Sequence, residues 1–330
     1  MHLALALLLL ACWLIRPAAA AEPLMQLEAK IPLGAVKGRI DHLAVDLRRR
    51  RLFVAELGNG SLGAIDLDGG KVLKRIVGLK EPQGIAYVSG PDLVYVASGG
   101  DGTVRRYTGE ELSSAGEPIK LGEDADNVRI AGTDHLVVGY GDGALAILEA
   151  ASGRRVREVT LPAHPESFQL ERDGGRAFVN LPKARQVGVV DLAAGTQVAG
   201  WKVAGLGGNF PMAVDEAAGR LFVVYREPAT LVAFDTRNGA VVGRVPTVGD
   251  ADDVFVDAKR RRIYVTGGEG AIAVVEPRGD AGYAELGRAP TVPGARTSLF
   301  VPELDRLYVA VRAARNEPAA VWVMRPSPSP

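Results

Sequence analysis

The chain carries a repeated pattern of apolar and polar positions. A short apolar stretch, a turn rich in Asp, Gly or Arg, an aromatic-aliphatic run and a further hairpin recur seven times. The centres of the aromatic-aliphatic runs are Phe53, Tyr95, Val137, Phe178, Phe222, Tyr264 and Tyr308, each 41 to 44 residues after the one before. A repeat of about 40–45 residues made of four short strands is typical of a propeller blade. We therefore predict an all-β fold, a seven-bladed β-propeller with four-stranded blades.

The first repeat shows how a blade divides into strands. Apolar residues at 43–45, 52–55 and 62–65 predict three strands, and the more charged segment 71–77 predicts the outermost strand. Glycine-rich hairpins such as Gly58-Asn59-Gly60 separate them, because glycine adopts the positive φ that tight turns need. The inner strands are nearly continuous apolar runs, as expected where neighbouring sheets cover both faces.

The two ends of the chain predict how the ring closes. The last repeat lacks an outer strand, and the segment from Leu24 to Ile31 supplies a spare strand before the first blade. We expect this segment to complete blade 7, which would remove two exposed sheet edges. The propeller is predicted to span residues 22–325, and the Pro/Ser segment 326–330 is expected to be disordered.

The N-terminus resembles an export signal. An apolar run from Leu3 to Ile15 is followed by small residues at 18–21, which predicts a secretory signal peptide over residues 1–21 with cleavage near Ala20 or Ala21. We therefore expect a periplasmic or secreted protein without a transmembrane segment. Alternatively, Leu9-Leu10-Ala11-Cys12 resembles a lipoprotein box, in which Cys12 would carry a lipid anchor. Cys12 is the single cysteine of the chain, so no disulfide can form within it.

The formal charge of the chain is balanced. Lysine and arginine together number 39, as do aspartate and glutamate. A neutral chain has no general electrostatic attraction to nucleic acid or to anionic lipid. We expect a monomer whose partner is a small polar ligand or a periplasmic protein rather than nucleic acid.

The repeats resemble a known family. Arg262-Ile263-Tyr264-Val265-Thr266-Gly267, followed by Ala271-Ile272-Ala273-Val274-Val275-Glu276, is similar to the YVTN-repeat (YncE-like) seven-bladed propellers. The resemblance covers about residues 24–324. It implies the fold and export, but the repeated residues are packing residues and imply no activity.

The starts of the predicted inner strands are unusually polar. These segments share one face of a propeller, around the mouth of the central channel, where convergent polar groups suggest a ligand site. The candidate ligand-binding residues are Asp41, His42, Gln83, Asp126, Asn127, Arg129, His164, Glu166, Asn209, Asp252, Asp253 and Arg296. Alternatively, these residues line a water-filled channel and cap strand ends.

Some of these residues could hold a metal. Glu166, Asn209 and Asp253 come from successive blades, and their oxygens suit a divalent cation such as calcium. The set resembles the calcium site of six-bladed gluconolactonase-like propellers, although the blade count differs. The leading hypothesis is a non-catalytic, exported propeller that binds its ligand or partner at the channel mouth. The alternative is a metal-dependent, lactonase-like hydrolase that uses the same channel.

Two basic runs lie on the opposite face. Residues 48–51 and 259–262 are predicted turns between the first and second strands of their blades. They are interpreted as solvated turn charges, or alternatively as a surface for an acidic partner or for single-stranded DNA, as the family resemblance suggests.

Overall fold

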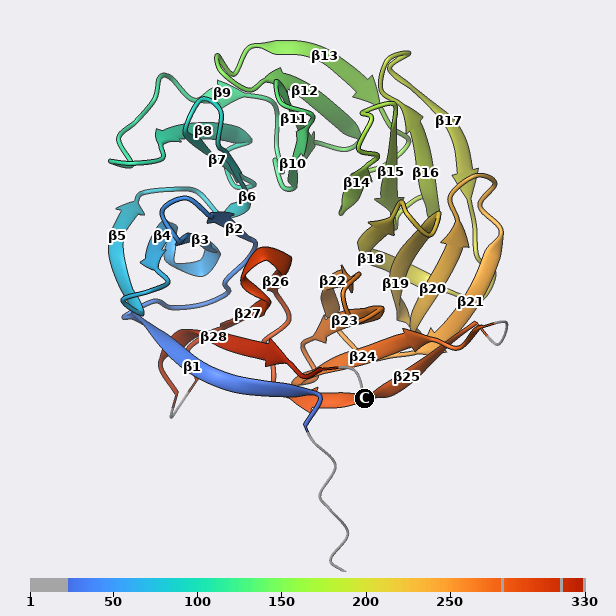
Figure 1. Ribbon diagram of the computed structural model, residues 1–330. Coiled ribbons are helices and arrows are strands. Elements are labelled where there is room, and N and C mark those ends of the chain that lie inside the picture. The colour runs from blue at the N-terminus through green and yellow to red at the C-terminus, as the bar shows by residue number, and fades with distance from the viewer. Residues whose placement is uncertain (1–22, 280–281, 315–316, 329–330) are drawn as a thin grey trace, which may run out of the picture.

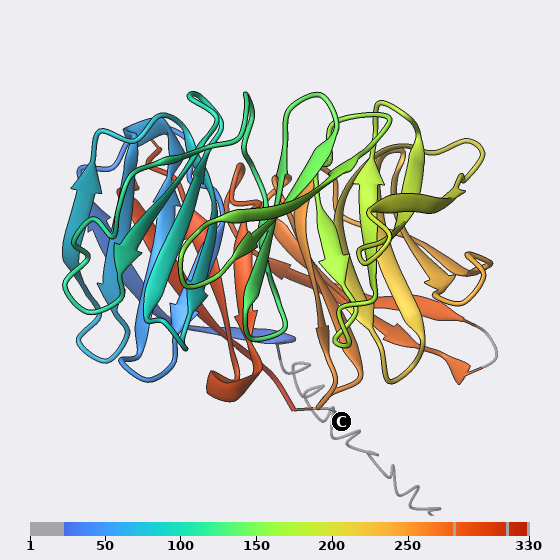
Figure 2. The ribbon, with the colours of Figure 1, turned by 90° about the horizontal axis from the view of Figure 1, so that it is seen from above.

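Seven four-stranded antiparallel sheets surround a central axis in the computed structural model (Figure 1). The structure describes residues 23–279, 282–314 and 317–328. The predicted signal peptide, with Cys12, lies outside these residues. Seen from the side, the sheets stand next to one another as the blades of a flat ring (Figure 2). The prediction of an all-β, seven-bladed propeller is confirmed.

Each blade runs from an inner strand at the axis to an outer strand at the rim. The inner strands of blades 1 to 7 are β2 (Leu43–Asp46), β6 (Pro82–Val88), β10 (Val128–Ala131), β14 (Phe168–Leu170), β18 (Gly207–Asp215), β22 (Ala251–Asp257) and β26 (Ser298–Val301). The second strands are β3 (Arg51–Glu56), β7 (Leu93–Ser98), β11 (His135–Tyr140), β15 (Arg176–Leu181), β19 (Arg220–Glu227), β23 (Arg262–Gly267) and β27 (Arg306–Val311).

The third strands are β4 (Ser61–Asp66), β8 (Thr103–Thr108), β12 (Ala144–Glu149), β16 (Gln186–Asp191), β20 (Ala229–Asp235), β24 (Ala271–Pro277) and β28 (Ala319–Pro326). The outer strands are β5 (Lys71–Val77), β9 (Ile119–Lys120), β13 (Arg155–Thr160), β17 (Thr196–Trp201), β21 (Val241–Pro246), β25 (Tyr283–Pro290) and β1 (Met25–Gly34). The four strands predicted for blade 1 are confirmed to within a residue or two.

The core is divided among the boundaries between blades. Seven apolar clusters each join residues of two neighbouring blades. The second strands contribute most, because they are covered on both faces: Leu52, Phe53 and Val54 of β3 are fully buried. The outer strands are largely exposed, as their charged sequences predict. Burial of apolar surface between blades is therefore what holds the ring together.

The first strand closes the ring, as predicted. β1 pairs with β28 from Met25 opposite Pro326 to Gly34 opposite Ala319, in the sheet β1-β28-β27-β26. The ordered chain also continues past the expected boundary at residue 325. Pro326 belongs to β28, and the Ser327 N–H donates to the carbonyl oxygen of Leu24 at 3.0 Å. The expected disorder therefore does not apply to these two residues, while 329 and 330 lie outside the described part.

Within the described residues, no helix has the length and apolar character needed to cross a membrane.

Candidate functional site

The polar starts of the inner strands line three cavities in and beside the central channel. The arginine cavity has a volume of about 90 Å³ and is lined by Arg39, Ile40, Asp250, Gly294, Arg296, Ala310 and Arg312. The carboxylate cavity, of about 30 Å³, is lined by Arg39, Asp41, His42, Asp126, Asn127, Glu166, Ser167, Phe210 and Asp252. The distal cavity, of about 340 Å³, includes His42, Arg129 and Asp253 among mostly apolar inner-strand residues. Arg39 lines the first two cavities and His42 the last two, so the three lie next to one another.

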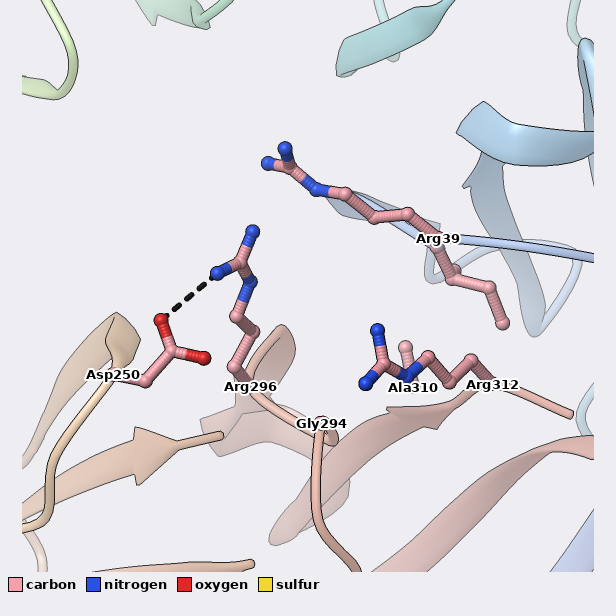
Figure 3. A pocket seen from close by; sticks show the side chains of 7 residues that line it. Arg39, Asp250, Gly294, Arg296, Ala310 and Arg312 are labelled. Atoms are coloured by element: carbon pink, nitrogen blue, oxygen red, sulfur yellow. Dashed lines mark hydrogen bonds and ion pairs between the residues drawn. The ribbon is translucent and has the colours of Figure 1, made fainter. Parts of the chain in front are cut away.

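Three arginines surround the arginine cavity (Figure 3). Arg39 precedes the inner strand of blade 1, Arg296 precedes that of blade 7, and Arg312 follows the second strand of blade 7. Arg296 contacts Asp250 and Asp252, both at 2.9 Å, and Arg39 contacts Asp41 at 2.7 Å. Arg312 has no ion pair in the described part of the chain and its side chain is exposed. Positive charge at this opening is therefore only partly neutralised.

Asp252 connects the arginine cavity to the carboxylate cavity. Its carboxylate contacts Arg296 and also the guanidinium of Arg226, which stacks on Phe210 with 3.7 Å from its carbon to the ring centroid. Asp250, two residues before, has φ of 50°, in the left-handed region that is uncommon for residues other than glycine. The carbonyl oxygen of Asp250 accepts a hydrogen bond from the Gly268 N–H at 2.9 Å, a contact that holds this backbone in place.

Asp126 and Glu166 of the carboxylate cavity lie close to His164. Each offers one possible ligand atom, and these three atoms lie within 4.8 Å of one another. Burial, together with the nearby charges of Asp41 and Glu166, raises the pKa of Asp126 well above its usual range. Burial also raises the pKa of Glu166, against the opposing influence of His164. Ionised carboxylates are thus unfavourable here unless a cation accompanies them.

The distal cavity contains buried charged groups of both signs. Burial raises the pKa of Asp253 well above its usual range, lowers that of His42 and lowers that of Arg129. One oxygen of Asp253 accepts a hydrogen bond from the Ser298 N–H at 2.7 Å. This bond crosses from blade 6 to blade 7, so Asp253 has a structural role.

Other polar residues of the ring also join neighbouring blades. Asn127 donates from its side-chain nitrogen to the carbonyl oxygen of Glu166, and Thr297 donates to that of Ile40 at 3.1 Å. Asn209 donates to the side-chain oxygen of Asn180 at 2.9 Å and to the Gln186 carbonyl at 3.0 Å. The interpretation of the ring as structural polar residues therefore applies to part of it.

Neither known family models nor curated protein sequences match this chain. Its fold is shared with solved structures. A chain of the Kuenenia stuttgartiensis hydrazine synthase structure is 17% identical over 85% of this chain and 98% of its own length, with a TM-score of 0.74. A chain of the mitotic checkpoint complex structure is 14% identical over 97% and 99%, with a TM-score of 0.75. At these identities the likeness supports the β-propeller fold alone.

The metal set suggested by the sequence is not gathered around one described cavity. Glu166 lines the carboxylate cavity, Asp253 lines the distal cavity, and the amide nitrogen of Asn209 is bound to Asn180. The structure instead places Glu166 beside Asp126 and His164. Glu166 precedes the inner strand of blade 4 and Asp253 lies in that of blade 6, two blades apart, and these strands are rotated relative to each other around the axis.

Two further residues predicted for the site, Gln83 and Arg129, pack against neighbouring residues. Gln83 packs with its side-chain nitrogen over Gly99, where a β-carbon would lie 2.2 Å from that nitrogen. Arg129 lies over the Phe168 ring, 5.8 Å from its centroid. Sequence reasoning did not select Arg39, Asp250 or Arg312 as site residues. In the repeat Arg296 is equivalent to Asp41, two residues after Arg39, so the repeat alone did not indicate that the two arginines meet.

Proposed function

We propose that this protein is an exported, non-catalytic propeller of the YVTN-repeat type that binds a small anionic ligand at the channel mouth. A carboxylate or phosphate group of the ligand would lie between Arg39, Arg296 and Arg312. The observation that carries the proposal is the convergence of three guanidinium groups from two blades, with one of them unpaired among the described residues. Export is supported by the apolar N-terminal segment.

The arginine cavity has the size and chemistry for such a group. Its volume of about 90 Å³ exceeds that of a single water, about 30 Å³ in the liquid. Guanidinium groups bind carboxylate and phosphate oxygens in paired, charge-assisted hydrogen bonds. Asp250 and Asp252 keep Arg296 in place but leave Arg312 with its charge uncompensated. An anion would therefore complete the charge balance of the mouth.

Calorimetric titration of the mature protein with citrate, glucuronate and a phosphate monoester tests the proposal. Arg312→Gln is expected to weaken binding about tenfold or more, since a hydrogen bond to a charged group contributes roughly 1.5–3 kcal/mol. Arg244→Gln is the matched control, because Arg244 is an exposed arginine of β21 without an ion pair in the described structure. Absence of binding by every anion, or equal loss in both variants, contradicts the proposal.

A metal-dependent hydrolase such as a lactonase is a second candidate. The observation that favours it is the group formed by Asp126, His164 and Glu166 at the same mouth. Turnover of a lactone or ester that requires added metal and is lost in Glu166→Gln would support the hydrolase. The binding protein instead returns its ligand unchanged.

A further inference from the structure

Asp126, His164 and Glu166 form a group with unbalanced charge between blades 3 and 4. Asp126 lies two residues before β10, and His164 and Glu166 lie just before β14. Among the described residues, neither carboxylate has a Lys or Arg nitrogen within 4.0 Å, and neither makes a side-chain hydrogen bond. One oxygen of Asp126 is buried without a partner. Two neighbouring buried carboxylates need either protons or a cation to be stable.

His164 is held in a tautomer that leaves the lone pair of Nε2 available to a metal. Its Nδ1 lies 2.6 Å from the carbonyl oxygen of Gly141. A carbonyl oxygen can only accept a hydrogen bond, so Nδ1 carries the hydrogen and the lone pair is on Nε2 when the ring is neutral. Metal-binding histidines are commonly oriented by such a bond from the other ring nitrogen. The nearest acidic neighbour of Nε2, Asp124 at 3.6 Å, has a largely exposed side chain.

The side-chain oxygen of Asn127 is a further possible metal ligand in the carboxylate cavity. The residue is 2% exposed, its side-chain nitrogen donates to the Glu166 carbonyl, and its side-chain oxygen is buried without a hydrogen-bond partner. A buried amide oxygen without a partner costs free energy unless a ligand approaches it. Asn127 lines the carboxylate cavity together with Asp126 and Glu166.

We propose that Asp126, His164 and Glu166, with the side-chain oxygen of Asn127, form a binding site for a divalent transition-metal ion. One imidazole nitrogen with carboxylate oxygens suits zinc, manganese or iron, whereas calcium takes oxygen ligands alone. Bonds of about 2.0–2.2 Å to zinc would draw the three ligand atoms closer together than their present 4.8 Å limit. The site is distinct from the arginine cavity and holds whether or not an anion binds there.

Titration calorimetry of chelator-stripped, dialysed mature protein with zinc, manganese and calcium chlorides tests the site. We expect one equivalent of zinc to bind, more tightly than calcium. Asp126→Asn and Glu166→Gln are expected to weaken zinc binding more than tenfold, and His164→Gln to reduce the preference for zinc over calcium. Asp142→Asn is the control, because Asp142 is an exposed aspartate on the neighbouring β11–β12 hairpin.

Three outcomes overturn the proposal. One is the absence of saturable zinc binding at millimolar zinc in the folded wild-type protein. Another is equal zinc affinity in wild type and in both carboxylate variants, with the fold verified by circular dichroism. The third is a wild-type protein that binds no metal, together with an Asp126→Asn variant whose melting temperature is higher than that of wild type. This result would show that the carboxylates of Asp126 and Glu166 share a proton. Anion binding in the arginine cavity is measured separately, before and after chelator treatment, so failure of either site is recognised on its own.

Discussion

Arg260 forms a bidentate ion pair with Asp305 across the boundary between blades 6 and 7. Its two terminal nitrogens lie 2.6 and 2.8 Å from the two oxygens of Asp305. One of them also contacts Asp257, at 2.9 Å, whose side chain is almost fully buried. Arg49 repeats the arrangement between blades 1 and 2, with Asp92 at 2.8 and 2.7 Å and Asp46 at 2.7 Å. These arginines therefore join neighbouring blades.

Loss of the Arg260 side chain is expected to destabilise the propeller strongly. Arg260→Ala would leave the buried carboxylate of Asp257 without its cation, and breaking a buried pair in this way costs about 3–5 kcal/mol. Urea unfolding of the purified variant measures the change in the free energy of unfolding.

Lys259→Ala is the matched control for Arg260→Ala. Lys259 also contacts Asp305, at 3.0 Å, but its side chain is 70% exposed. An exposed ion pair contributes only about 0–1 kcal/mol. Similar losses in the two variants would show that Arg260 acts as an ordinary surface charge.

The role of these arginines could not be predicted from the sequence. The sequence alone favours solvated turn charges for the runs at 48–51 and 259–262, or alternatively a surface for an acidic partner or for single-stranded DNA. In fact the Arg260 side chain is 6% exposed and that of Arg49 is 23% exposed. Their partners, Asp305 and Asp92, lie about one repeat further along the chain, and a local charge run does not show such a pairing.

The fold, in contrast, could be predicted because it depends on local patterns. Apolar runs such as the one around Phe53 are set by local alternation and repeat at a fixed spacing, and even the closing strand followed from a missing element in blade 7. Whether Glu166, Asn209 and Asp253 come together could not be predicted from the sequence, because it depends on the angles between blades. Asp253 is also one residue further along the repeat than Glu166, as the pairing of Gln169 with Phe178 and of Phe255 with Tyr264 shows. Glu166 and Asp253 line different cavities.

Asp253 is expected to make stability depend on pH. Burial raises the pKa of its carboxyl in the folded protein, whereas an unfolded aspartate titrates near pH ~3.9. The stabilising contribution of the protonated form is therefore complete below about pH 4 and is lost as the pH rises through the folded pKa. Asp253→Asn keeps an acceptor for the Ser298 N–H, so it should match wild type in acid and exceed it at neutral pH.

Asp305→Asn supplies the opposite sign for the same measurement. Hydrogen bonds from Arg260 lower the pKa of Asp305 below its usual range. Its contribution is present above about pH 4 and is lost as the pH falls through the folded pKa. Unfolding curves at acidic and neutral pH should show Asp305→Asn losing stability at neutral pH only. For the Asp253 prediction, parallel stability profiles of wild type and Asp253→Asn against pH would be the contradicting result. They would show that the pKa of Asp253 is the same in the folded and unfolded protein.

The closing strand β1 provides the last test. Ile31 is 3% exposed and packs in the cluster between blades 7 and 1, opposite Val321 in the ladder. Ile31→Ala is expected to lower the free energy of unfolding by about 2–5 kcal/mol, as for other large apolar residues cut back to alanine in a core. Leu27 lies on the same strand but is 41% exposed. Leu27→Ala should therefore change the free energy of unfolding by less than about 0.5 kcal/mol. Urea unfolding of both variants distinguishes the loss of buried packing by β1 from a general effect of any substitution in this strand. Equal effects would mean that β1 adds hydrogen bonds to blade 7 without closing its core.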